Sequence, residues 1–286
     1  MHRLYLIPMF LLAASTNSLA ESFNKSDIVG IKLGIKRSEA EYILQNKVKN
    51  AFVYRENATI KSNYFSKEIT LGLISDITNQ DTAKSDANSR DLDQVWVSVD
   101  PNDSDGIVFG VSRYTTFTTG NRSTFRSYVD ALITKYGQYT KKVGDDSNYS
   151  SVDYFWIEGD VRNIEPNGIG KCLQMAEFHI SNAKFNNPRV NAPQHGRGSI
   201  FASQLSMNFP DYSTWSKTCK SVLHVRLEHP HFHTEDQNLV AAAEFTFVNL
   251  QEADELVAKF RKYFSDSARN SQDKINVEHA KRTPQL

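Results

Sequence analysis

The sequence predicts an α+β protein in which antiparallel sheets carry helices packed on one face. Two stretches alternate apolar and polar residues as strands do, segments rich in turn-forming residues join the strands, and each hairpin precedes a helix with apolar residues three and four apart. The chain has 286 residues, 40% of them hydrophobic and 11% aromatic. This is enough apolar material for a sizeable core.

The clearest unit is a hairpin followed by a helix. Alternating apolar residues predict strands over 95–99 and 107–111, and the segment 100–106 between them is dense in turn formers. Apolar residues from Phe125 to Tyr136 predict a helix that Ser123 caps and Gly137 ends. We expect this helix to bury its apolar stripe on one face of the hairpin. Earlier in the chain, the capping-box spacing of Ser38 and Glu41 predicts a short helix to about residue 49.

The same order of elements recurs 128 positions later, with strands expected at 223–227 and 239–248 and a helix ending at Phe264. The recurrence predicts two related strand-turn-strand-helix units, and chance recurrence of a common pattern is the alternative. The expected divisions are a signal peptide (1–20), an N-terminal unit (21–143), a C-terminal unit with a disulfide (144–264) and a polar tail, frayed or disordered (265–286).

Composition argues against some classes of function. The 33 basic and 33 acidic residues give a formal net charge of zero, so no long-range field attracts a nucleic acid. The aromatic content also argues against disorder over the whole length.

The first twenty residues have the pattern of a secretory signal peptide. A basic start at His2 and Arg3 precedes an apolar run over 4–14 and small residues that end at Ala20. The run is too short to span a bilayer, and no later segment has the required length. We therefore expect cleavage after Ala20 and a periplasmic or secreted protein without a membrane span.

Export changes the expected role of the two cysteines, Cys172 and Cys219, which lie 47 positions apart. In an oxidising compartment two thiols pair more readily than they act as a nucleophile or a metal ligand. We expect a structural disulfide between them, and a catalytic cysteine is the alternative.

Three histidines form the most distinctive local motif. His229, His231 and His233 alternate, so an extended chain would present their rings along one edge, as zinc or copper would require. One extended strand does not easily converge three rings on one ion, and a solvated hairpin tip is the competing interpretation. The acidic turn 100–106 lacks the glycine and glutamate of a calcium loop, so it is expected only to keep a hairpin tip solvated.

Two residues are candidate binding anchors. Trp96 lies on the strand face opposite the valines, and Arg226 lies on the corresponding face of the later strand. Residues of these types anchor protein interfaces, although burial of Trp96 under a loop or a second sheet is the alternative. No standard enzyme signature is found, so the sequence offers no catalytic residues and implies no cofactor.

The segment 27–35, followed by Glu39, Ala40 and Leu44, resembles the opening of many exported bacterial domains of uncharacterised function. It also looks like the start of the small modules of the outer-membrane assembly lipoprotein and beta-lactamase-inhibitor protein superfamily, in which a Gly-Met-Ser turn caps a short helix on an antiparallel sheet. Here Ile35 and Lys36 replace the Met and Ser. The tripeptide at 135–137 is like the Lys-Tyr-Gly that closes helices in such proteins. The resemblance implies an α+β module that binds protein or envelope components, and it supplies no catalytic residues.

The expected function is therefore noncatalytic binding of a protein or cell-envelope component through an exposed sheet face or hairpin loops. A metal-binding protein or metal-dependent enzyme that uses the three histidines is the first alternative. A cofactor-free hydrolase with an unlocated site is the second.

Overall fold

The computed structural model describes residues 26–47, 52–61, 66–76, 93–100, 103–144, 151–159, 219–230, 236 and 238–280. Its elements in chain order are α2 (Arg37–Lys47), β1 (Phe52–Lys61), β2 (Ser66–Asp76), β3 (Asp93–Val99), β4 (Val108–Thr116), a 3-10 turn (Thr119–Asn121), α3 (Phe125–Tyr136), β5 (Lys141–Val143), β6 (Val152–Gly159), β7 (Cys219–Glu228), β8 (Ala242–Asn249) and α7 (Leu250–Ala280).

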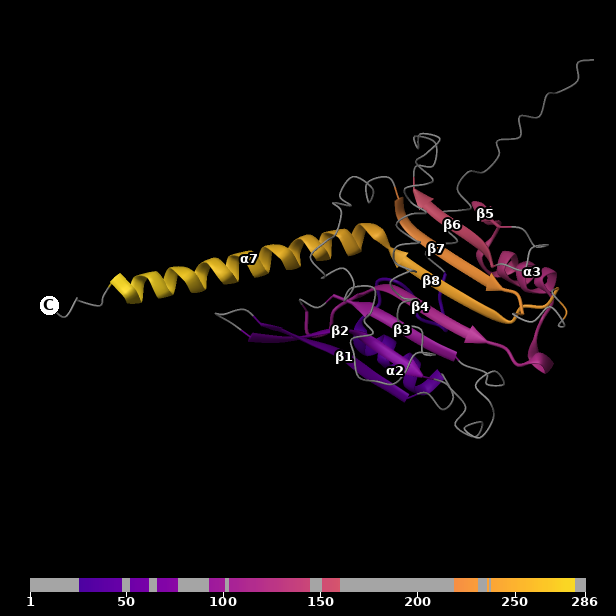
Figure 1. Ribbon diagram of the computed structural model, residues 1–286, viewed down its shortest axis with the longest axis horizontal. Coiled ribbons are helices and arrows are strands. Elements are labelled where there is room, and N and C mark those ends of the chain that lie inside the picture. The colour runs from indigo at the N-terminus through magenta and orange to yellow at the C-terminus, as the bar shows by residue number, and fades with distance from the viewer. Residues whose placement is uncertain are drawn as a thin grey trace, which may run out of the picture.

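The eight strands of the described residues form one antiparallel sheet in the order β1-β2-β3-β4-β8-β7-β6-β5 (Figure 1). Seven strands have seven residues or more, and the edge strand β5 has only three. The prediction of an α+β fold with an antiparallel sheet is confirmed.

The two halves of the chain meet at the centre of this sheet. Among the described elements, α2 is followed by β1–β4 and α3 is followed by β5–β8, and the last strand of each series is central in the sheet. The expected hairpin-helix units are present as β3-β4-α3 and β7-β8-α7, and the shared order extends to the strands before them. The two units form one continuous sheet because β4 pairs with β8 from Gly110↔Val248 to Thr116↔Ala242.

Helices α2 and α3 cover one face of the sheet. Because strand side chains alternate between faces, Val95, Val97, Val111 and Phe247 point to this face together. They share a buried cluster with residues of both helices and of the segment before α2. The cluster includes Ile28, Ile31, Ala40, Leu44, Phe125, Leu132 and Tyr136.

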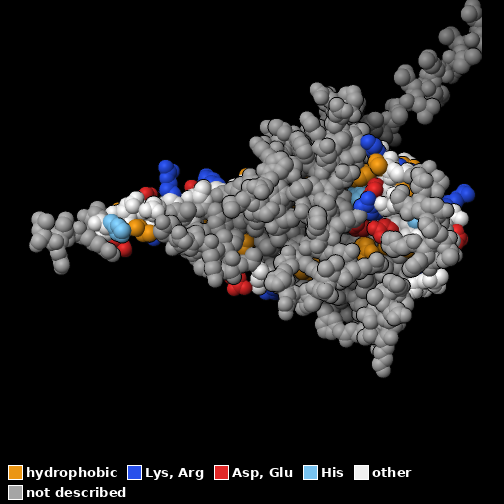
Figure 2. Space-filling model, in the orientation of Figure 1, with side chains coloured by type: hydrophobic (Ala, Val, Ile, Leu, Met, Phe, Trp, Pro, Cys, Tyr) orange, Lys and Arg blue, Asp and Glu red, His pale blue; other side chains and the backbone are white. Residues whose placement is uncertain are grey.

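Helix α7 begins against the sheet and then leaves it. Its first turns bury Leu250, Ala253 and Leu256, which lie outside the cluster that α2 and α3 share. Figure 1 shows the helix extending away from the sheet, and Figure 2 shows basic and acidic side chains interspersed along the projecting part. The helix was expected to end at Phe264 but continues to Ala280, through the first part of the expected polar tail. No glycine or proline interrupts 250–280, so polarity there does not end the helix.

Two helix caps differ from the sequence-based expectation. Thr124, and not Ser123, caps α3, since its hydroxyl accepts the Ser127 N–H at 3.2 Å. The expected end at Gly137 is confirmed by its φ of 81° and its N–H bond to the Ile133 carbonyl.

Helix α2 begins at Arg37 and is capped from a distance. The Ser38 N–H and hydroxyl both donate to the Asp105 carboxylate, at 2.8 and 2.9 Å. The expected capping box is therefore wrong: Glu41 pairs instead with Arg55 at 3.0 Å. Gly106 lies close to Asp100 at the base of the acidic turn, where an added Cβ would be 2.0 Å from the Asp100 carbonyl oxygen. The hydrogen bonds from Ser38, chiefly the one from its backbone N–H, lower the Asp105 pKa.

Candidate functional site

A strained turn forms one wall of the candidate site. Ile28 and Ile31 exchange two backbone hydrogen bonds of 3.0 Å, and Asp27 Oδ1 accepts the Gly30 N–H at 2.7 Å. The turn forces Val29 to a φ of 57°, in the left-handed region that β-branched residues rarely adopt. Strain of this kind persists only where surrounding contacts fix the backbone, and it is common at binding sites.

Hydrogen bonds from α3 hold this turn in place. The Asp27 carbonyl accepts from Lys135 Nζ and from the Tyr136 hydroxyl, each at 3.0 Å. Lys135 Nζ also lies 3.3 Å from Asp27 Oδ1. The end of α3 and the segment before α2 are thereby fixed to each other across 108 positions of chain.

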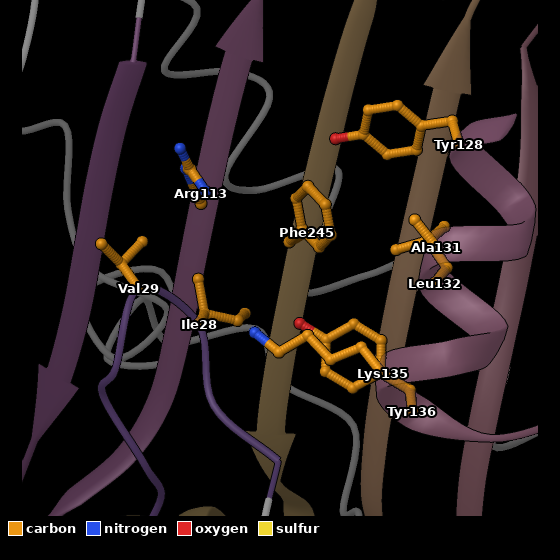
Figure 3. A pocket seen from close by; sticks show the side chains of 9 residues that line it. All are labelled: Ile28, Val29, Arg113, Tyr128, Ala131, Leu132, Lys135, Tyr136 and Phe245. Atoms are coloured by element: carbon orange, nitrogen blue, oxygen red, sulfur yellow. The ribbon is translucent and has the colours of Figure 1, made fainter. Parts of the chain in front are cut away.

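Between the turn, α3 and the central strands lies a cavity of about 230 Å³ (Figure 3). Its walls are largely apolar, and charged or hydroxyl groups stand at its two ends. The lining residues are Ile28, Val29, Arg113, Tyr128, Ala131, Leu132, Lys135, Tyr136 and Phe245.

Arg113 lies in the cavity because of strand register. It follows Val111 by two positions on β4, and its neighbours across the ladders are Val95 and Phe245, so it points to the helix-covered face. Asp93 holds its guanidinium with two hydrogen bonds, Nε to Oδ1 at 2.8 Å and Nη2 to Oδ2 at 2.6 Å. Burial opposes the charge, but the hydrogen bonds and charge of Asp93 leave the Arg113 pKa above its ordinary value. The side chain therefore stays cationic.

Tyr128 supplies a hydroxyl near the same end of the cavity. Figure 3 shows this hydroxyl above the Phe245 ring, on the end of the Tyr128 ring that points toward Arg113. Burial raises the Tyr128 pKa to about 12, so the phenol is protonated at neutral pH and serves as a hydrogen-bond donor. Within the described part of the chain, the hydroxyl donates to no protein acceptor.

The opposite face of the sheet carries a buried polar network rather than an open surface. His224 Nε2 lies 2.7 Å from Asp153 Oδ1, and Arg226 Nε lies 3.2 Å from the same oxygen. On the neighbouring strands the Ser112 and Thr246 hydroxyls are 3.3 Å apart. His224 and Thr246 are 1% exposed and Ser112 is 3% exposed. The expected open sheet face is thus wrong at the centre of the sheet.

The two predicted binding anchors lie on this opposite face, with β4 and β8 between their strands. Trp96 pairs with Ile74 and Ser112 and is half-buried. Arg226 is also half-buried and donates to the Ser151 hydroxyl at 2.7 Å. The sheet does not bring the two side chains together, and their binding role stays a prediction.

The histidine motif is described only in part. His229 is buried, and its ring stacks on Phe125 with centroids 4.0 Å apart, which is a packing role. His231 and His233 lie outside the described residues. Among the residues with a described position, no group of three His, Cys, Asp or Glu side chains is placed to hold a metal ion.

Cys219 is buried at the start of β7, and Cys172 lies outside the described residues, so the disulfide stays a prediction. The signal peptide also lies outside them.

Sequence reasoning missed the cavity residues, although one signal was present. The alternation that places Val111 on the buried face also places Arg113 there, and a charged residue at an inward position is unusual. Tyr128 and Tyr136 were assigned only to the apolar stripe of α3. Nothing in the sequence alone predicts that Val29 adopts a left-handed conformation.

Comparisons with protein-family models, with curated proteins and with solved structures find no match. In the part of the chain that is described, no helix combines the length and apolar character that crossing a membrane requires.

Proposed function

We propose that this chain is an exported, noncatalytic binding protein, and that its site is the cavity between α3, the Val29 turn and the central strands. The observation that supports the proposal most strongly is that three segments distant in sequence enclose apolar walls with a few donors at the ends. Small-molecule sites have this composition.

The volume restricts the ligand to a small molecule. Drug-sized ligands occupy pockets of roughly 300–1,000 Å³. The cavity of about 230 Å³ is smaller, so it suits a compact molecule and not a folded partner or a peptide.

The chemistry of the lining favours binding over catalysis. None of the nine lining residues is Ser, Cys, His, Asp or Glu. Lysine and tyrosine also serve as nucleophile or general base, but Lys135 and Tyr136 both donate to the Asp27 carbonyl. The third such residue, Tyr128, is a protonated phenol at neutral pH because burial raises its pKa to about 12. The cations at the cavity, Arg113 and Lys135, are held by Asp93 and Asp27. Such fixed groups orient a ligand.

The cavity is a better candidate binding site than either face of the sheet. Helices cover one face, and the central polar side chains of the other face are buried. A protein or envelope component stays a candidate source of the ligand, since a small part of a larger molecule can enter a cavity.

The test is a blocking substitution at the cavity. Ala131 is exposed on α3 and lines the cavity, so Ala131→Phe places a ring there with little effect on the core. We expect 3-phenyl-1-propanol to cause saturable NMR shifts at cavity residues of the wild-type protein and none in Ala131→Phe.

The matched control is Ala258→Phe, which adds the same ring to an exposed position of α7. This variant is expected to bind the probe as the wild type does. Equal binding to the wild type and Ala131→Phe contradicts the proposed function. Absence of binding to the wild type contradicts it if the carboxylate and amide analogues of the probe also fail to bind.

A further inference from the structure

We propose that the preferred ligand of the cavity is a small monocarboxylate with an apolar body, whose carboxylate binds between Arg113 and Tyr128. This inference rests on the proposed function and adds the chemical class of the ligand.

One edge of the Arg113 guanidinium has no partner among the described residues. A guanidinium has five N–H groups in a planar fork and is able to serve two carboxylates on different edges. Asp93 uses Nε and one N–H of Nη2. Within the described part of the chain, Nη1 has no protein partner. The edge formed by Nη1 and Nη2 therefore remains for a second planar acceptor.

The Tyr128 hydroxyl is a second hydrogen-bond donor at this end of the cavity. Figure 3 shows it directed toward the Arg113 side of the cavity, above the Phe245 ring. It donates and carries no negative charge at neutral pH, so it favours an acceptor and does not repel an anion. The Tyr128 donor and the Arg113 cation therefore suit the carboxylate of a ligand. The Phe245 ring beside them suits the apolar body to which that carboxylate is attached.

The apolar walls between the two ends of the cavity favour a ligand with an apolar body. Ile28, Leu132 and Phe245 are buried core residues that also line the cavity, so a hydrocarbon or aromatic group would contact side chains without polar atoms. Ala131 stands at the exposed rim. The body must be compact because the volume is only about 230 Å³.

The charge of the ligand follows from the ion pairs around the cavity. Arg113 is paired with Asp93, and Lys135 with Asp27, so the local charge is already balanced. One added negative charge is stabilised by the free edge of the guanidinium. The other lining cation, Lys135, stands at the opposite end of the cavity and already donates to Asp27 twice. A monoanion therefore fits better than a dianion such as a phosphate monoester.

The experiment compares three probes of one shape by isothermal titration calorimetry on the full mature chain. These are 3-phenylpropanoate, 3-phenylpropanamide and 3-phenyl-1-propanol. We expect the wild type to bind the carboxylate about tenfold more tightly than the amide, because charge-assisted hydrogen bonds are about twice as strong as neutral ones.

Variants assign the preference to residues. Tyr128→Phe keeps the ring and is expected to weaken carboxylate binding about tenfold while leaving alcohol binding within about twofold. Tyr42→Phe, at a tyrosine that is 62% exposed on α2, is the matched control and should change neither. Arg113→Lys retains the charge but not the fork, and should remove the preference for carboxylate over amide. Circular dichroism checks the fold of each variant.

The outcomes separate the two proposals. If all three probes bind equally and Ala131→Phe blocks them all, the cavity is a binding site but the carboxylate assignment is wrong. If the amide or alcohol binds more tightly than the carboxylate, or if Tyr128→Phe leaves carboxylate binding unchanged, the assignment is also wrong. If no probe binds the wild type, the proposed function itself fails.

Discussion

Replacing Phe247 by alanine is predicted to weaken the whole sheet at once. Phe247 is 2% exposed on β8, and its ladder neighbours are Val111 of the N-terminal half and Leu223 of the C-terminal half. Truncation of a buried phenylalanine to alanine costs about 3–5 kcal/mol. At about 2–4 °C per kcal/mol for a domain of this size, the melting temperature should fall by roughly 6–20 °C.

The assay must report on both halves of the chain. Fluorotryptophan labelling gives separate NMR signals for Trp96 on β3 and Trp156 on β6 during denaturation in urea. We expect both signals to shift to the same lower midpoint in Phe247→Ala. Tyr263→Ala, at an aromatic residue that is 42% exposed on α7, should change stability by less than about 0.5 kcal/mol. A lower midpoint at Trp156 with an unchanged midpoint at Trp96 would refute a single cooperative sheet.

Three further predictions concern caps, charge and the cysteines. Thr124→Ala should cost about 1 kcal/mol in urea denaturation and Ser123→Ala much less, because only the Thr124 hydroxyl caps α3; equal effects would contradict the assignment. The Asp105 pKa lies below its ordinary value of 3.8, so Asp105 stabilises the fold above that pH and loses its effect as the pH falls. The melting-temperature difference between wild type and Asp105→Ala should therefore shrink below pH 4, and a constant difference would count against the Ser38 contact. Reduction of the predicted disulfide at Cys219 should add two hydrogens to the mass and cost up to about 4 kcal/mol of stability, and an unchanged mass would exclude it.

The sequence was sufficient for elements whose pattern is local. The alternation at 95–99 and the stripe from Phe125 to Tyr136 became β3 and α3 because one buried face dictates each pattern. Strands β1 and β2 were not predicted, since charged and polar residues interrupt their apolar positions. Their place in the sheet comes from pairing with each other and with β3, which no local pattern reveals.

The candidate site depends almost wholly on distant contacts. Lys135 and Tyr136 meet Asp27 across more than 100 positions, and Asp93 reaches Arg113 across a strand pair. The apolar stripe of α3 correctly predicted that Tyr136 is buried. Nothing in that pattern predicted that its hydroxyl donates to Asp27. The cap of α2 also depends on a distant contact, since Asp105 lies in a turn 67 positions from Ser38.

The most direct test of the account is the position of bound 3-phenylpropanoate in the labelled protein, measured by intermolecular nuclear Overhauser effects. We predict contacts from the probe ring to the Ile28 and Leu132 methyl groups and to the Phe245 ring. Contacts to Trp96 or Arg226 on the opposite face, with none in the cavity, would contradict the account.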